Sequence, residues 1–329
     1  MKIFLSVLLI LVTILIIIYL AGSKPVKPVY ALNLPKVPSI AKLPDYVINK
    51  EAKVKVKPGN EAEVVWADSN KREQTDYAIV YLHGFSASKA EGNPAYYYLA
   101  NALKANIYLA RLADHGIDTV APMQYFTADR LWESAKEAYA IGRKLGKKVI
   151  LVGTSTGGTV ALQLAAAFPE VNSLVLMSPN IAINDPNAWL LNDHWGLQIA
   201  RKVIGGDERK VTGKTKAYKK YWYTNYRLES VVELEEFVES SMTPTLFAQV
   251  KQPVLMLYYY KDEQHQDPVV RVDAMLKMFD QLGTSTALKQ KVAIPNAGNH
   301  VIGSSITSKD IHGVELAMEG FIKSRLNEN

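Results

Sequence analysis

Short apolar runs alternate with amphipathic stretches along most of this chain. Beyond residue 60, runs of consecutive apolar residues predict buried parallel strands at 78–82, 106–110, 148–152, 173–177, 254–259 and 291–294. Apolar residues at helical spacing predict helices at 94–103, 128–145, 159–168, 269–282 and 313–326. Strand–helix alternation of this kind predicts an α/β fold, with a mostly parallel central sheet covered by helices on both faces.

Two weaker strand candidates mark the start of this α/β domain. Coarse periodicity predicts strands at 52–57 and 63–68, and the sequence between them contains Pro-Gly-Asn, which is typical of a turn. These limits place the folded domain at 51–329.

One region interrupts the alternation. Between the strand that ends near residue 178 and the strand that starts at 254, about 75 residues have no clear strand pattern. Because so long a structureless loop is improbable in a compact domain, we expect a helical cap at about 187–250, inserted before the strand at 254–259. Its interleaved lysines and aromatic residues also suit stacking on nucleic acid, but we prefer a solvated cap whose rings turn down onto the domain.

The first 23 residues form a separate element. No charged side chain occurs from residue 3 to residue 23, and about 20 apolar residues suffice for a helix to cross a bilayer. A cleavable signal peptide is the alternative, but its apolar region is usually shorter, so we favour an uncleaved transmembrane anchor at 1–23. The chain has no cysteine, which excludes a lipid anchor attached through that residue.

Residues 24–50 are rich in lysine and proline. Five of the 15 prolines lie between positions 25 and 44, and this spacing favours an extended, polyproline-like backbone. We therefore expect a semi-rigid stalk that joins the anchor to the domain. The alternative is an irregular arm packed on the domain.

The formal charge of +6 belongs to this tether. Residues 22–60 contain eight lysines and two acidic residues, whereas residues 61–329 contain 29 basic and 30 acidic residues. Nucleic acid is therefore a poor candidate as a partner. Lys2 precedes the apolar run while Lys24 and Lys27 follow it, which points weakly to a cytoplasmic domain, but the N terminus also looks like an export signal, and we favour an extracytoplasmic domain.

The strongest local signal for chemistry is a G-x-S-x-G pentapeptide, Gly153–Gly157, with Ser155 at its centre. A predicted strand ends just before it, at Val152, and an Ala/Leu-rich helix follows Gly158. A sharp strand–turn–helix corner exposes the serine hydroxyl, and small neighbours let the backbone pass without clashes. We therefore expect Ser155 to be a nucleophile. A glycine-rich, phosphate-binding helix start is the alternative, but the chain has neither a P-loop lysine nor G-x-G-x-x-G.

A second motif supplies candidates for an oxyanion hole. His83-Gly84-Phe85 stands at the end of a predicted buried strand. A tetrahedral acyl intermediate needs two preorganised N–H donors, and the amides of Phe85 and Thr156 are the natural pair. We expect His83 itself to be a structural hydrogen-bonding residue.

A serine hydroxyl needs a general base. Of the six histidines, His300 lies in a loop after the last predicted strand, from which it can reach the corner at Ser155. The base in turn needs a carboxylate to fix its tautomer, and two candidates follow the strand at 254–259. Strand register favours Asp262, whereas the distance to the next helix favours Asp267, with 263–266 as an insertion. We prefer Asp267.

At these residues the segment from about 75 to 325 resembles the α/β-hydrolase superfamily, within its capped branch of esterases, monoacylglycerol lipases and serine aminopeptidase-like enzymes. The pieces that match are His83-Gly84-Phe85, 111–116, Gly153–Gly157, 262–270 and Asn299-His300. The resemblance implies that Ser155 is the nucleophile, His300 the base and 187–250 a lid over the acyl pocket. The chain departs from the branch at Tyr258-Tyr259-Tyr260, where a glycine usually precedes the acid, and at Asp114, in a loop that commonly reads R-G-H-G.

These residues predict a membrane-tethered serine hydrolase of carboxylic esters, for example short acyl esters or monoacylglycerols. This chemistry needs no metal and no organic cofactor. An amide or peptide hydrolase with the same residues is the alternative among enzymes. A non-catalytic, membrane-tethered binding protein of the same fold is the alternative from another class, and the presence of Ser155, His300 and two candidate acids argues against it.

Overall fold

The core of the protein is a seven-stranded sheet. A computed structural model describes residues 2–326 and arranges the strands in the order β1-β3-β2-β4-β5-β8-β11. Their bounds are β1 (Glu63–Val65), β2 (Thr75–Leu82), β3 (Asn106–Leu109), β4 (Gly146–Thr154), β5 (Ser173–Met177), β8 (Val254–Tyr258) and β11 (Lys289–Ala293). Only β1 is antiparallel to its neighbour, and all other pairings in this sheet are parallel. The predicted mostly parallel α/β sheet is confirmed.

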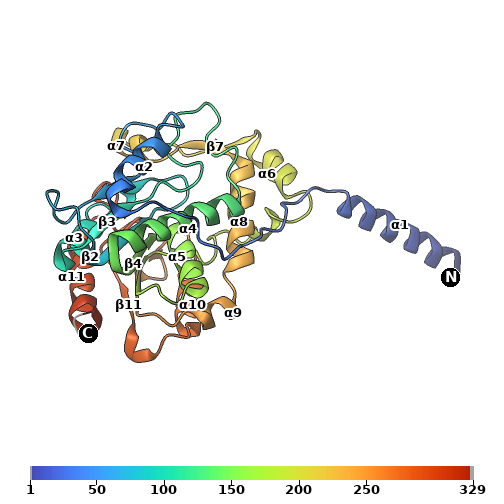
Figure 1. Cartoon of the computed structure of the whole chain (residues 1–329). Coiled ribbons are helices and arrows are strands. Elements are labelled where there is room, and N and C mark those ends of the chain that lie inside the picture. Colours follow the sequence, from blue (N-terminus) through green and yellow to red (C-terminus); the bar gives the residue numbers. More distant parts are fainter. Residues whose placement is uncertain (1, 327–329) are drawn as a thin grey trace.

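Helices cover both faces of this sheet (Figure 1). On one face, α3 (Ala95–Leu103) and α11 (Ile311–Phe321) pack in one apolar cluster with residues of β2, β3 and β5. On the other face lie α4 (Ala128–Leu145), α5 (Thr156–Ala167) and α10 (Val272–Gln281). A short π-helical turn, η5 (Ile322–Leu326), extends α11. Each helix lies within a few residues of its predicted position.

Helix α4 shows how the local sequence sets these elements. Thr127 caps its first turn by accepting a hydrogen bond from the Arg130 amide. At its other end, Gly146 begins β4 directly, and a Cβ there would stand 2.3 Å from the Ala78 nitrogen on β2. Glycine therefore lets the helix end against the neighbouring strand.

The insertion between β5 and β8 is mostly helical, as expected, but includes strands that the sequence did not predict. Its elements are η3 (Ala188–Leu190), α6 (Gly196–Ile204), β6 (Glu208–Lys210), α7 (Lys216–Tyr221), β7 (Asn225–Arg227), α8 (Leu228–Ser241) and α9 (Pro244–Gln249). Strands β6 and β7 pair in antiparallel fashion, with Glu208 opposite Arg227. Strands of three residues are too short to show an alternation of apolar and polar positions, and β6 consists of charged residues alone. Helices α8 and α9 pack on α4, α5 and α10, so the later part of the insertion belongs to the helical layer.

The first helix, α1 (Lys2–Leu20), has no buried residue and projects from the body (Figure 1). It is long and apolar enough to cross a membrane, a property that an N-terminal signal sequence shares. It is the one helix among residues 2–326 that meets this criterion.

The expected stalk at 24–50 is not a free spacer, and this prediction was wrong. The segment runs along the domain: the Trp132 indole donates to the Ala31 carbonyl at 2.9 Å, and the Lys136 ammonium donates to the Asn33 carbonyl at 2.9 Å. It continues into a 3₁₀ turn, η1 (Ile40–Lys42), and then into α2 (Leu43–Glu51), whose Leu43 is fully buried. A proline in the first helical turn leaves the hydrogen bonds of a helix intact, so Pro44 starts α2 rather than extending a stalk.

The predicted strand at 52–57 was also wrong. Helix α2 ends at Glu51, and the following residues form a turn in which Val56 makes a single bridge to Ile117. The packed domain therefore begins within the arm, ahead of the expected boundary at residue 51.

Candidate active site

Ser155 lies at a sharp corner between β4 and α5. Its backbone angles, φ 52° and ψ −120°, lie in a region that side chains rarely occupy. The corner is held by the Ser155 amide, which donates to the Met177 carbonyl at 3.0 Å, and by the Ser155 carbonyl, which accepts from the Asn180 amide at 3.0 Å. A Cβ on Gly157 would stand 1.9 Å from the Leu82 carbonyl oxygen, so the corner can press against β2 only with glycine there.

His300 and Asp267 form a buried pair. The Nδ1 atom of His300 is 2.7 Å from Asp267 Oδ2, and the two side chains are 9% and 0% exposed. The other carboxylate oxygen of Asp267 accepts from the amides of Val269 and Val270 at 2.9 and 3.1 Å. On the far side of the imidazole ring, Nε2 is buried and makes no hydrogen bond within the described residues.

The pKa values in this pair follow from its contacts. Burial alone would raise the pKa of Asp267, but the charge of His300 and the three hydrogen bonds lower it below its ordinary value. Burial alone would lower the pKa of His300, but Asp267, together with the carboxylate of Glu91, raises it. Asp267 therefore stays ionised and stabilises a positive charge on the imidazole ring.

The two candidate acids occupy different surroundings. Asp262 ends β9 (Tyr260–Asp262), which pairs with β10 (His265–Gln266) in a small hairpin. Its side chain is 50% exposed and lies 2.8 Å from the Nδ1 atom of His265. Of the two carboxylates, only Asp267 contacts His300. The hairpin occupies the stretch that the sequence offered as an insertion.

The predicted oxyanion donors flank this corner. Thr156 is the first residue of α5, where a helix leaves its N–H groups without internal partners. Phe85 follows Gly84 in the loop after β2. No hydrogen bond of either amide occurs within residues 2–326. The Phe85 ring is held edge-on by Tyr226 of β7 and by Phe126, with centroids 5.3 and 5.4 Å away.

Comparison with known proteins identifies the family. The profile described as "Alpha/beta hydrolase family" matches residues 79–305, more than half of the chain. The chain belongs to this family. A search of curated proteins finds no match to this hydrolase.

Solved structures share the hydrolase fold at low identity. One is reported in work on LipS and LipT, two metagenome-derived lipolytic enzymes, and has a TM-score of 0.64 at 19% identity, covering 82% of this chain and 99% of its own. The monoacylglycerol lipase of Paleococcus ferrophilus has a TM-score of 0.57 at 14% identity, covering 80% and 98%. Est1E of Butyrivibrio proteoclasticus with bound ferulic acid has a TM-score of 0.53 at 15% identity, covering 82% and 96%. At these identities the likeness shows the fold.

Histidines 83 and 115 support the loops of the hydrolase. His83 Nε2 accepts from the Leu112 amide at 3.0 Å, and its Nδ1 lies 2.9 Å from the Gly84 carbonyl, to which it donates as the neutral tautomer. Burial lowers the pKa of His83 well below its ordinary value and that of His115 to about 4. His83 therefore joins the loop after β2 to the loop after β3, the structural role expected from the sequence.

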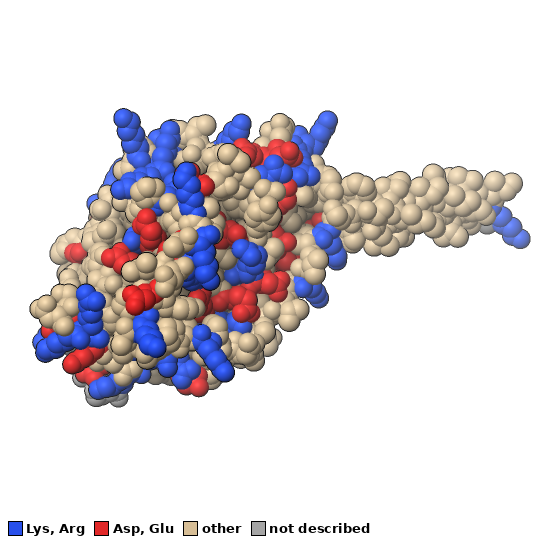
Figure 2. All heavy atoms as spheres, turned by 45° about the horizontal axis from the view of Figure 1, so that its top comes forward, with Lys and Arg blue, Asp and Glu red and all other residues tan. Residues whose placement is uncertain are grey.

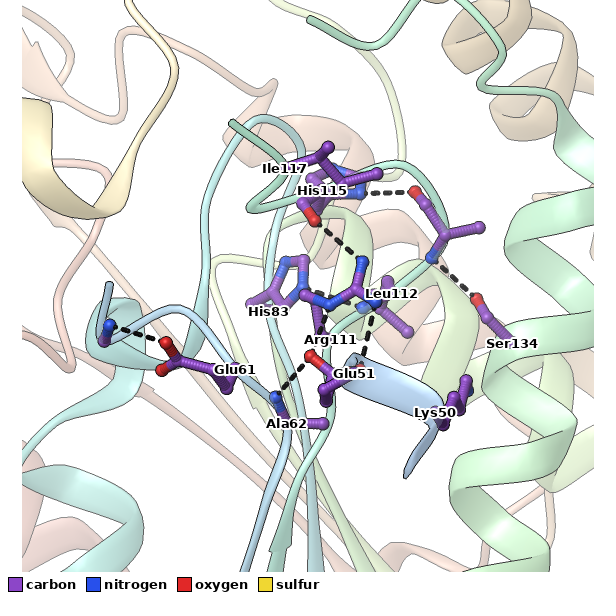
Figure 3. Close-up of polar contacts among 12 residues, drawn as sticks. Lys50, Glu51, Glu61, Ala62, His83, Arg111, Leu112, His115, Ile117 and Ser134 are labelled. Carbon is purple, nitrogen blue, oxygen red and sulfur yellow. Dashed lines mark hydrogen bonds and ion pairs between the residues drawn. The ribbon is translucent and has the colours of Figure 1, made fainter. Parts of the chain in front are cut away.

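The arm reaches the same loops through α2 (Figure 3). Arg111 binds both carboxylate oxygens of Glu51, at 2.6 and 3.0 Å, and donates to the His115 carbonyl at 3.1 Å. Both ionised side chains are 8% exposed. A buried, two-point ion pair thus fixes the loop that begins at Arg111 to the helix that the sequence placed in a stalk.

Glu91 is a buried group near the site that sequence reasoning missed. It lies in a 3₁₀ turn, η2 (Lys89–Gly92), is 2% exposed and accepts a hydrogen bond from the Gly84 amide. Its two oxygens and the Cβ of Ser155 all lie within 3.0 Å of the point where a Cβ on Gly84 would stand. Burial raises the pKa of Glu91 to about 7. No motif marks this residue, because its polar, small-residue surroundings are typical of a solvated loop.

The site has the groups for nucleophilic acyl chemistry. Among residues 2–326, no group of three or more His, Cys, Asp or Glu side chains is arranged to hold a metal ion. The arrangement can supply a hydroxyl at Ser155, a base at His300, a fixed negative charge at Asp267 and two free amides.

Proposed function

We propose that this hydrolase cleaves carboxylic esters through an acyl-enzyme on Ser155. The observation that carries the proposal is the buried His300–Asp267 pair together with Ser155 at the strained corner. In the part of the chain that the structure describes, His300 Nε2 has no hydrogen-bond partner. A nucleophile, an oriented base and an orienting carboxylate are the three parts that serine hydrolases require.

In the proposed mechanism Ser155 Oγ attacks the acyl carbon while its proton passes to His300 Nε2. The carbonyl oxygen becomes an oxyanion that the Phe85 and Thr156 amides stabilise. As the C–O bond to the alcohol breaks, His300 donates the proton to the leaving oxygen. Water then attacks the acyl-enzyme by the same route, which releases the acid and restores Ser155.

The charge of the base sets the pH dependence of this mechanism. His300 must be neutral to accept a proton, so kcat/KM falls as the pH drops through the pKa of His300. Because the pKa of His300 is raised, this loss begins at a higher pH than for an ordinary histidine.

The nature of the structural neighbours supports an ester as the substrate. They include lipolytic enzymes, a monoacylglycerol lipase and a thermophilic esterase. We propose a short acyl ester or a monoacylglycerol for this chain. An amide or peptide substrate would use the same residues, and initial rates on p-nitrophenyl esters of increasing chain length beside aminoacyl anilides separate the two substrate classes.

Helix α1 completes the proposal. Its 19 residues are long enough for a membrane span, and we propose that it is retained as an anchor, with the catalytic domain on the extracytoplasmic side. Site-specific protease access in intact cells tests this orientation.

The decisive experiment is labelling with a fluorophosphonate. The wild type should become labelled and inactive, whereas Ser155→Ala should bind no probe and hydrolyse no ester. A folded wild type that remains unlabelled would contradict the proposed serine hydrolase and favour a non-catalytic binding protein.

The two candidate acids provide a matched pair of variants. Asp267→Asn should reduce kcat by up to about 10⁴-fold, because the wrong imidazole tautomer is then held against the serine. Asp262→Asn should stay near wild type, since its carboxylate contacts His265 in an exposed hairpin. The reverse outcome would move the acid to Asp262.

A further inference from the structure

The outward face of α6 has an apolar stripe. Trp195, Ile199 and Val203 are four residues apart, so they lie on one side of the helix, and they are 36%, 42% and 78% exposed. Another large apolar residue, Trp189 in the turn before α6, is 54% exposed. A contiguous exposed stripe of large apolar residues marks a surface that contacts something other than water.

This stripe begins where α1 leaves the body. The Trp195 indole donates to the Ile18 carbonyl at 2.8 Å, and its amide donates to the Ser23 carbonyl at 3.1 Å. The Tyr19 hydroxyl donates to Asp193 at 2.7 Å. A Cβ on Gly22 would stand 2.3 Å from the Trp195 ring, so the indole fits against the chain only because a glycine is there. The cap therefore binds the C-terminal end of α1 through hydrogen bonds and a close ring contact.

Three lysines near the stripe form no ion pair within the described residues, although the carboxylate of Asp193 also lies there. Lys24, Lys27 and Lys202 take part in none of the ion pairs of residues 2–326. In contrast, Arg201 is paired with Asp207 and Glu229. Figure 2 shows α1 as a rod without charged side chains between the body and the basic residue at its tip. Unpaired lysines beside exposed apolar residues are the composition that binds a membrane surface rich in anionic lipids.

We propose that the α6 stripe lies in the head-group layer of an anionic bilayer that α1 spans, so that the cap of this hydrolase rests on the membrane. The inference depends on the proposed anchor. If α1 spans the bilayer, its last turn with Tyr19 lies at the interface, where tyrosine and tryptophan are enriched. Trp195 is bonded to that turn and therefore lies at the same depth, and with α6 along the bilayer surface the exposed Ile199 and Val203 would face the lipid.

The absence of cysteine makes a direct test possible. In full-length protein reconstituted into vesicles of equal phosphatidylcholine and phosphatidylglycerol, Val203→Cys would carry a nitroxide, with Leu288→Cys as the matched control. Leu288 is 37% exposed and precedes β11, at the end of the sheet opposite Ser155. We expect the label at 203 to be protected from an aqueous relaxation agent and accessible to oxygen in the lipid, and the label at 288 to show the opposite.

The outcomes separate the stripe, the anchor and the enzyme. Protein that floats with the vesicles while both labels stay water-exposed would overturn the α6 surface and keep the anchor. Protein that does not float would overturn both. Hydrolysis of a soluble p-nitrophenyl ester, measured on the same samples, reports on the proposed function independently of either result.

A second inference comes from Glu91 and is independent of the membrane. Its carboxylate accepts a hydrogen bond from the Gly84 amide, and the polar ends of Trp222 and Tyr81 face it. These three groups lie in the loop after β2, at the end of α7 and on β2 itself. A single buried group therefore connects the cap, the sheet and the residue that precedes Phe85.

We infer that Glu91 is a positioning residue that fixes the Gly84–Phe85 backbone and with it one amide of the oxyanion hole; this inference rests on the proposed esterase mechanism. The titratable groups that face it are Tyr81, Tyr218 and His300. Because the charge of Glu91 raises the pKa of His300, the carboxylate also influences the base.

The variants Glu91→Gln and Glu91→Ala separate position from charge. Glutamine keeps an acceptor for Gly84, so kcat should be largely retained while the acidic limb of the kcat/KM profile moves to lower pH. Alanine removes the acceptor and should lower kcat at least tenfold with a smaller change in KM. The inference would be overturned if both variants fold and keep the wild-type kcat and the wild-type acidic limb of the pH profile. Fluorophosphonate labelling of each variant is the control that shows whether Ser155 still reacts.

Discussion

Helices α1 and α2 both precede the sheet, but only α2 is part of the catalytic domain. Helix α1 is almost wholly apolar and buries no residue. Helix α2 contains a proline and charged residues and is far more polar on average than α1, yet it buries Leu43, Val47 and Glu51. The strongly apolar segment therefore adds nothing to the domain core, while the mixed segment holds a loop of the candidate site.

The difference shows that spacing decides burial more than composition does. Leu43 and Val47 are four residues apart and thus lie on one face of α2, which packs on the domain. Glu51, one turn further, carries the ion pair to Arg111. A helix that is apolar on all sides has no single face that packs on a domain, and its composition suits a lipid environment.

Two deletions give the largest contrast between the helices. Removal of residues 1–51 should leave no soluble, folded enzyme, because it exposes the face of the sheet layer that Leu43 and Val47 cover and leaves Arg111 buried without its partner. Soluble yield and thermal unfolding measure this result. An active, soluble product would mean that α2 is dispensable and that the arm is a spacer after all.

The ion pair gives the next largest effect. Glu51→Ala should lower the free energy of unfolding by about 3–5 kcal/mol, because an unpaired buried charge remains on Arg111. The variant should also lose activity at a lower temperature than the wild type, because the loop that begins at Arg111 bonds to His83 through the Leu112 amide. Asp45→Ala, at an exposed position on the same helix, is the control and should change the unfolding free energy by less than about 0.5 kcal/mol. Equal effects of the two substitutions would contradict the structural role of the pair.

An apolar pair on α2 tests packing without charge. Leu43→Ala should cost about 2–3 kcal/mol, in the lower part of the range for buried leucine because a peripheral helix can relax. Ile48 is 65% exposed, so Ile48→Ala should be close to neutral. Urea unfolding of both variants measures the difference, and similar midpoints would show that α2 does not pack as described.

The smallest expected effect belongs to α1. Deletion of residues 1–22 leaves the contacts of Trp132 and Lys136 with the arm in place, so the melting temperature and the rate on a soluble ester should stay at the full-length values. Vesicle binding should fall sharply. A loss of activity in solution would show that α1 supports the cap as well as the membrane attachment.

The centre of the sheet could be predicted because its strands are buried on both faces and therefore appear as apolar runs. The run at 173–177 coincides with β5, and those at 106–110 and 254–259 differ from β3 and β8 by one residue. Elements whose stability comes from polar contacts could not be found in this way. Strand β6 depends on its pairing with β7, and α2 was hidden by prolines that are as typical of a helix start as of a stalk.

The residues of the candidate site likewise divide into those that a sequence pattern predicts and those that depend on contacts in the folded protein. Ser155 and His300 stand at positions that the strand order dictates, so motif and topology suffice to propose them. The choice between Asp262 and Asp267 depends on a two-strand hairpin at 260–266 that only the structure shows. Glu91 depends on contacts with Gly84, Tyr81 and Trp222, which lie far from it in sequence or give no periodic signal.

The backbone of Ser155 sets stability and activity against each other at one residue. Angles of φ 52° and ψ −120° match the first central position of a type II′ turn, which glycine dominates. A side chain there costs about 1–3 kcal/mol of folding free energy. Glycine would therefore be the most stable residue at this corner. Under the proposed mechanism, the domain accepts a lower stability there because the nucleophilic hydroxyl must stand at that place. Under the same mechanism, selection for heat resistance alone would drive this position toward glycine and abolish the proposed activity.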